Sequence, residues 1–210
     1  MGLFRTRLPK VVALAVVGAG IATSGLSLSG IAHGAGTYAF DQGHTEVMAS
    51  WNHLGMSTQT LEFTSVDGSV VFDEANVSNS ALNVTIDATS VSTGYAVFDD
   101  HIQAGDFFDT ANHPTITFVS TRVEKTGERT GRVTGDLTIK GITKPATLDV
   151  TFVFGGEHPL AQYVEAYKGA QYASFSATGT VKRSDYAVDK FAPAVSDEIE
   201  IVINTEMRLQ

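Results

Sequence analysis

The chain has 210 residues, of which 43% are apolar and 18% charged, a composition that can fill a sizeable core and excludes a disordered chain. Its net charge of −9 repels phosphate backbones and anionic headgroups, which argues against nucleic acid as a partner and against peripheral membrane binding. The absence of cysteine excludes disulfides, thiolate catalysis, iron–sulfur clusters and a lipid anchor on cysteine.

The first 34 residues have the pattern of a signal peptide. Arg5, Arg7 and Lys10 precede an uncharged apolar run over residues 11–21, and a Ser/Gly/Ala-rich stretch follows. The run is shorter than the ~20 residues that span a bilayer. A buried N-terminal helix is the less favoured alternative, because no polar face interrupts the run. We therefore expect residues 1–34 to be cleaved, and residues 35–210 to form one domain without a transmembrane segment, exported to the periplasm or outside the cell.

From residue 38 onward the apolar residues recur with a period of two, which predicts strands with one apolar and one polar face. The clearest alternating runs cover residues 47–51, 82–86, 116–118, 133–139, 148–154, 175–181 and 199–203. We expect about eight antiparallel strands, because an even number can close on itself and leave no exposed edge. The predicted fold class is all-β, an extended eight-stranded antiparallel barrel of lipocalin-like form with one or two short helices.

Glycine and proline mark the predicted turns between these strands. Asp67-Gly68 lies between two apolar runs and predicts a tight hairpin turn. Residues 126–131 predict a longer polar hairpin loop. Lys140-Gly141 follows the predicted strand over residues 133–139 and marks the turn at its end. Pro145 is expected to limit strand pairing after that turn.

Two segments depart from the strand pattern. Phe98–Asp109 is the best candidate for a short helix, with Asp106 or Asp109 capping a helix end. Pro159–Lys168 spaces its apolar residues at helical intervals and predicts a helix or a lid loop.

Small residues accompany large ones on the apolar faces, which favours a barrel interior with room for a chain. The same alternation also packs a solid core, so a filled barrel is the alternative. A slender lipid would gain about 0.8 kcal/mol for each CH₂ group that it buries. The inward-facing candidates for contact with such a ligand are Val47, Ala49, Trp51, Val84, Ile86, Phe118, Leu137, Ile139, Phe152, Phe175 and Ala177.

Seven motifs, in order and at compatible spacing, resemble those of the YceI-like, polyisoprenoid-binding family. They are Tyr38–Asp41 with His44-Thr45, His53–Ser57, Asp100–Ile102 with Gly105–Asp109, His113–Phe118, Gly135–Pro145, Arg183–Tyr186 and Ser196–Glu198. The resemblance covers residues 38–210. It implies a lipocalin-like barrel that holds an isoprenoid or a related long lipid, export from the cytoplasm, and frequent pairing into homodimers.

The chain also departs from the family pattern. Ala49 lies where the family prefers an aromatic residue and Trp51 where it prefers an aliphatic one, which would reshape the cavity. Residues 58–63 lack the family's Gly-x-Phe, and Ser174 replaces the glycine before Phe175. Ala187 replaces the glycine that follows the Arg-Ser-Asp-aromatic motif.

Four further residues complete the candidate ligand site. His53 follows Trp51 on one predicted strand. Phe107 and Phe108 would either plug one end of the barrel, which we favour, or form part of the cavity mouth. Arg183 would belong to an ion pair, which we favour, or bind a lipid headgroup through bidentate hydrogen bonds to phosphate.

The sequence does not predict catalysis or a metal centre. His44 and His53 have opposite parity on one strand, and none of the histidines has a partner at metal-ligand spacing. No Gly-x-Ser-x-Gly motif occurs, and capping or solvation explains the acidic pairs.

The sequence therefore predicts a non-enzymatic carrier that sequesters a polyisoprenoid, an isoprenoid quinone or a similar chain, with this lipid as its only bound group. Two alternatives stay open. One is a periplasmic enzyme that uses His44, His53, His101 or His113 on a lipid- or quinone-like substrate. The other is a ligand-free structural or stress-response domain.

Overall fold

The computed structural model describes residues 35–210, so the predicted signal peptide, residues 1–34, lies outside the described residues. Strands dominate this part of the chain. They are β1 (Gly36–His53), β2 (Ser57–Phe63), β3 (Val66–Phe72), β4 (Ala81–Asp87), β5 (Val91–Ser92), β6 (Thr115–Lys125), β7 (Thr130–Ile139), β8 (Ile142–Glu157), β9 (Gln171–Lys182) and β10 (Glu198–Leu209). The α-helix is α1 (Ala96–Gln103), and four 3₁₀ turns are η1 (Val77–Asn79), η2 (Ala88–Ser90), η3 (Glu165–Tyr167) and η4 (Arg183–Tyr186).

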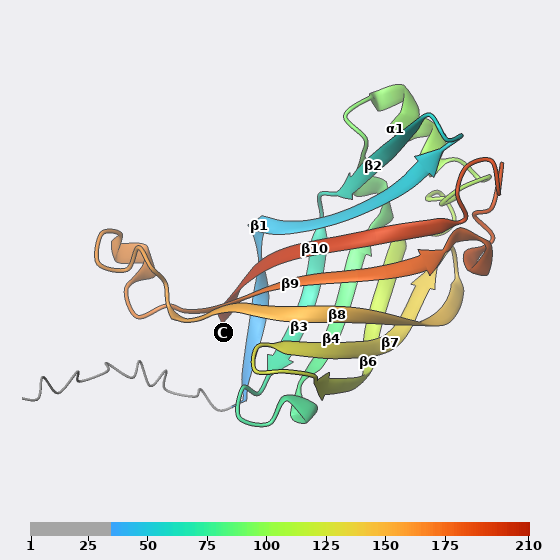
Figure 1. Cartoon of the computed structure of the whole chain (residues 1–210). Coiled ribbons are helices and arrows are strands. Elements are labelled where there is room, and N and C mark those ends of the chain that lie inside the picture. Colours follow the sequence, from blue (N-terminus) through green and yellow to red (C-terminus); the bar gives the residue numbers. More distant parts are fainter. Residues whose placement is uncertain (1–34) are drawn as a thin grey trace, which may run out of the picture. The chain divides into compact units, whose positions relative to one another are not determined.

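The strands form one antiparallel sheet that closes into a barrel. Its order is β10-β9-β8-β7-β6-β4-β3-β1, and β1 pairs with β10 to complete the ring of eight strands (Figure 1). β2 pairs with the second half of β1, on the side where β3 pairs only with the first residues of β1, and β5 pairs with β2. The predicted eight-stranded antiparallel barrel is confirmed, and closure leaves the ring without a free edge.

The alternation in sequence produces this wall directly. In β8, residues from Ala146 onward alternate between half-buried and exposed, so that Leu148, Val150 and Phe152 face inward while their neighbours face solvent. Burial of one face against the interior fixes the register, because a slip by one residue would expose the whole apolar set.

β1 has an irregular middle at the seam where the barrel closes. Tyr38–Phe40 pair with β10, but the pairing resumes only at Thr45, so residues 41–44 bulge from the wall. On its other side, β1 pairs with β3 only at Gly36–Tyr38 and with β2 only from Val47 onward. Between these two paired stretches, the Gln42 side-chain amide of β1 bridges to Val66, the first residue of β3. It donates to the Val66 carbonyl oxygen and accepts from the Val66 N–H at 3.4 Å.

The predicted hairpin turn at Asp67-Gly68 is wrong. Both residues lie inside β3, where they pair with Thr85 and Val84 of β4. Gly68 has a φ of +135°, and a Cβ at this position would lie 2.1 Å from the Asn83 carbonyl oxygen. Glycine is therefore required for the close approach of two strands and does not mark a turn.

Two other predicted turns are present. Lys140 and Gly141 form a two-residue turn between β7 and β8, with φ values of 51° and 74°, as a hairpin turn with positive φ requires. The polar loop between β6 and β7 is also present, although Thr130 and Gly131 already belong to β7. Pro145 does not limit pairing as expected, because it lies opposite Asp136 in a ladder that continues on both sides of it.

The helical predictions are confirmed in part. The helix α1 begins at Ala96 and ends at Gln103, and the rest of the predicted segment forms turns. Neither Asp106 nor Asp109 caps it, because Asp106 pairs with Lys190 and Asp109 accepts from the Asn112 side chain at 3.0 Å. Residues 159–168 form a loop with the single turn η3, which projects beyond the barrel at the end opposite to the η4 segment (Figure 1).

Candidate ligand cavity

A cavity of about 590 Å³ lies inside the barrel, so the interior is not the solid core that the alternation also allowed. This volume is within the range of small-molecule sites in proteins, roughly 300–1,000 Å³. Its wall is mostly aliphatic and aromatic. Water gains few hydrogen bonds on such a surface, so an apolar guest is the favoured occupant.

Every residue that the sequence analysis proposed for the ligand site lines this cavity. They are Val47, Ala49, Trp51, His53, Val84, Ile86, Phe107, Phe108, Phe118, Leu137, Ile139, Phe152, Phe175, Ala177 and Arg183. Their common placement follows from strand parity, which puts one face of each strand on the inside. That they contact a ligand stays a prediction.

Aromatic side chains gather at the end of the cavity beneath α1. The Trp51 and Phe98 rings lie 6.2 Å apart, and the Phe63 and Phe108 rings meet edge to face at 5.6 Å. Phe107 and Phe108 are half-buried and line the cavity, so they combine the two roles considered for them, plug and cavity wall.

A second aromatic group narrows the opposite end. Phe72 lies 5.3 Å from the Phe152 ring and 5.0 Å from the Phe175 ring, measured between centroids. Arg129 folds back over this group, 4.9 Å from the Phe152 centroid, and its Nε donates to the Phe152 carbonyl oxygen at 2.9 Å. The cavity therefore lies between two aromatic ends.

Arg183 does not form the ion pair that the sequence analysis favoured. Its guanidinium donates to the carbonyl oxygens of Val188 at 2.7 Å and of Val195 and Ser196 at 2.9 Å each, with a longer contact of 3.3 Å to Lys190. Burial lowers the pKa of Arg183, against the attraction of nearby carboxylates. Arg183 thus holds together the segment between β9 and β10, and its guanidinium keeps few free donors for a lipid headgroup.

Two lysines hold the segment that follows α1 against the end of the barrel beneath α1. Lys140 Nζ donates to the carbonyl oxygens of Gly105 at 2.8 Å and of Ala187 at 3.1 Å. Lys190 pairs with the Asp106 carboxylate, and this contact holds the pKa of Asp106 below its ordinary value. The segment after α1 is therefore tied to the segment before β10.

Several polar residues reach the cavity that sequence reasoning missed. Thr45 and Thr205 face each other across the β1–β10 seam, with their hydroxyl oxygens 2.9 Å apart. Lys125, Glu128 and Arg129 line the end near the β6–β7 loop. A polar loop in the sequence carries no signal that it folds back over a cavity, so only the tertiary structure reveals these residues.

The histidines lie apart, as strand parity predicted. His44 is exposed on the outside of the wall, whereas His53 lines the cavity. His101 packs between the Phe98 and Phe107 rings.

The helix α1 is too short to cross a membrane, and within residues 35–210 no helix is long and apolar enough to do so.

A closed antiparallel barrel around an apolar internal cavity defines the class of this protein. The chain belongs to the YceI-like domain family, whose model matches residues 38–207. Among its relatives, Protein YceI of Escherichia coli O157:H7 is 37% identical over 163 residues, which cover 78% of this chain and 81% of that protein.

Solved structures share the same fold. The crystal structure of Burkholderia cenocepacia BcnA matches with a TM-score of 0.69 and 27% identity, covering 80% of this chain and 98% of that one. A polyisoprenoid binding domain from Saccharophagus degradans matches with a TM-score of 0.56 and 13% identity, covering 84% and 99% respectively. At that identity the second match supports the fold alone.

Proposed function

We propose that this protein is an exported carrier that sequesters one long apolar lipid, a polyisoprenoid, an isoprenoid quinone or a similar chain, inside its barrel. The cavity of about 590 Å³ with its aliphatic and aromatic wall carries the proposal. Each CH₂ group that leaves water contributes about 0.8 kcal/mol, so a long chain binds without many polar contacts. Membership of the YceI-like family supports the same ligand class, and the Saccharophagus degradans domain of the same fold is itself named for polyisoprenoid binding.

The chemistry of the wall favours binding over catalysis. The titratable residues that reach the cavity lie near its ends, and Lys190 and Arg183 are engaged by Asp106 and by backbone carbonyls. The Thr45 and Thr205 hydroxyls also reach the cavity, but they hydrogen-bond to each other. A mostly apolar wall of this kind can hold a chain, whereas catalysis needs an acid, a base or an activated nucleophile placed against it. Export is supported by the pattern of residues 1–34, with its basic start, short apolar run and small-residue stretch.

The end of the barrel beneath α1 is the proposed entrance for the lipid. Large apolar side chains are exposed there on three neighbouring segments, the β1–β2 turn, the start of α1 and the segment before β10. They are Leu54, Met56, Tyr95, Val97 and Phe191. The Leu54 N–H donates to the Ala194 carbonyl oxygen at 3.1 Å, which holds two of these segments together. Phe191 also lines the cavity, so this apolar rim is continuous with the interior.

Filling the cavity tests the proposal. Ala177 is 8% exposed and faces inward, so Ala177→Phe should displace ligand volume, with a cost in stability of about 1–3 kcal/mol. Thr178→Phe, one residue along β9 and facing solvent, is the matched control. We expect Ala177→Phe to bind the fluorescent probe N-phenyl-naphthylamine at least about tenfold more weakly, and Thr178→Phe to bind it like the wild type.

A long polyprenol should displace the probe from the wild type and from Thr178→Phe. Ala146→Phe, a second inward variant on β8, guards against a folding defect in Ala177→Phe. Circular dichroism should show the same fold for all the variants. Undiminished probe binding by both inward variants, or no displacement by the polyprenol, would contradict the proposal.

A further inference from the structure

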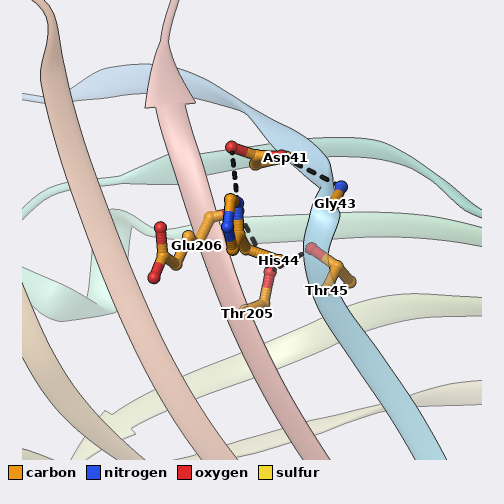
Figure 2. A network of polar contacts seen from close by, with 6 residues as sticks. All are labelled: Asp41, Gly43, His44, Thr45, Thr205 and Glu206. Carbon is orange, nitrogen blue, oxygen red and sulfur yellow. Dashed lines mark hydrogen bonds and ion pairs between the residues drawn. The ribbon is translucent and has the colours of Figure 1, made fainter. Parts of the chain in front are cut away.

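Asp41, His44 and Glu206 form a cluster on the outer face of the barrel, away from the cavity. Each offers one ligand atom, and these three atoms lie within 4.8 Å of one another (Figure 2). Two residues belong to the bulge in β1, and the third lies on β10 opposite that bulge. The cluster therefore spans the seam at which the first and last strands close the barrel.

The spacing of two of these ligand atoms already suits a metal ion. His44 Nδ1 lies 3.2 Å from Asp41 Oδ2. Ligand atoms at 2.0–2.1 Å from a tetrahedral zinc ion are separated by roughly 3.4 Å, so this pair needs little adjustment. Glu206 has a flexible side chain that can close the remaining distance, and its carboxylate forms no hydrogen bond or ion pair with any side chain or backbone group of residues 35–210.

The surrounding groups hold the ligands in place. The Gly43 N–H donates to Asp41 Oδ1 at 3.0 Å, which orients the carboxylate and leaves Oδ2 toward His44 (Figure 2). On the inner face, the Thr45 and Thr205 hydroxyl oxygens lie 2.9 Å apart and fix the two strands next to the bulge. A hydrogen bond to a metal ligand, such as the one from Gly43 to Asp41, typically improves metal affinity 10–100-fold.

We propose that Asp41, His44 and Glu206 bind one borderline divalent cation of the zinc type, with water completing its coordination. One imidazole nitrogen with two carboxylate oxygens suits Zn²⁺ and its neighbours in the first transition series. Mg²⁺ and Ca²⁺ prefer an all-oxygen shell and should bind much more weakly. The ion would cross-link β1 and β10, so the site acts as a staple at the seam. No metal centre was expected from the sequence, because only histidines at metal-ligand spacing were considered there. The cluster instead combines one histidine with carboxylates from two strands.

Metal titration of the untagged full chain, stripped with a chelator, tests this site. We expect one equivalent of Zn²⁺ by isothermal titration calorimetry, and a Co²⁺ absorption spectrum typical of nitrogen and oxygen ligands. His44→Ala and Glu206→Gln should each weaken Zn²⁺ binding at least about tenfold. His101→Ala removes another exposed histidine outside the cluster and should leave Zn²⁺ binding unchanged.

The metal cross-link between β1 and β10 should also raise the thermal stability of the protein. Zn²⁺ should raise the unfolding temperature of the wild type and of His101→Ala, but not that of His44→Ala, because only binding to the folded chain stabilises it. His44 has an exposed side chain (58%), so its removal should not disturb the fold. Wild-type Zn²⁺ affinity in His44→Ala or in Glu206→Gln would overturn the proposal, as would equal affinity for Mg²⁺. Asp41, His44 and Glu206 do not line the cavity, so the results for His44→Ala and Glu206→Gln are independent of lipid binding.

Discussion

Ala187 holds a backbone conformation that favours glycine. It follows η4 with φ 54° and ψ 41°, and its N–H reaches the Ser184 carbonyl oxygen at 3.5 Å. An L-residue pays roughly 1–2 kcal/mol in this left-handed region, because its Cβ crowds the following carbonyl. The sequence comparison with the family had already marked this alanine as a replacement for glycine.

Ala187→Gly should therefore stabilise the protein by about 1 kcal/mol, after subtracting the greater entropy of the unfolded glycine. Urea unfolding at neutral pH measures the difference. Ala111→Gly is the matched control, because Ala111 is exposed and lacks a positive φ. The control should be neutral or slightly destabilised, and a stability loss in Ala187→Gly equal to that of the control would refute the strain argument.

At the scale of elements, the Asp197 carboxylate joins Arg183 in holding the segment between β9 and β10. Asp197 accepts from the Ser184 N–H at 2.8 Å and from the Ser184 hydroxyl at 2.7 Å. These hydrogen bonds hold the pKa of Asp197 below its ordinary value of 3.8, and the Arg183 charge adds to the effect. Because the folded pKa is the lower one, this stability is present above the unfolded pKa and is lost as the pH falls through the folded pKa.

We expect the free energy of unfolding of the wild type to fall as the pH drops below about 4. Asp197→Asn should be less stable than the wild type at pH 7 and should lose less stability on acidification. Ser184→Ala should reduce the acid sensitivity in the same direction. Urea titrations between pH 2.5 and 6 supply the comparison, and parallel curves for the wild type and Asp197→Asn would rule out this contribution.

The elements also show what sequence patterns can predict. Alternation in β8 and β9 depends only on local residues and the face that they bury, so their strands and inward positions were predicted. The Asp41–His44 bulge and the break between β2 and β3 depend on neighbours far along the chain, so no local pattern marks them. Gly68 was misassigned because glycine serves both turns and close strand contacts.

At the scale of the whole molecule, the cavity site was more predictable than the outer cluster. Parity placed Val84, Phe118 and Ala177 inside once closure of the barrel was assumed. Glu206 joins Asp41 and His44 only because β10 pairs with β1, which no spacing in the sequence reveals. Whether the interior is open also depends on how all inward side chains pack together, so the cavity itself required the structure.

The measurement that tests the proposed carrier function most directly is native mass spectrometry of the protein purified from cells that express the full-length chain, followed by solvent extraction of the bound lipid. We expect one molecule of a long isoprenoid, quinone or related chain for each barrel, and its loss from Ala177→Phe but not from Thr178→Phe. A wild-type protein that is ligand-free, and that stays so after incubation with polyisoprenoids, would contradict the proposal and favour a structural domain or an enzyme.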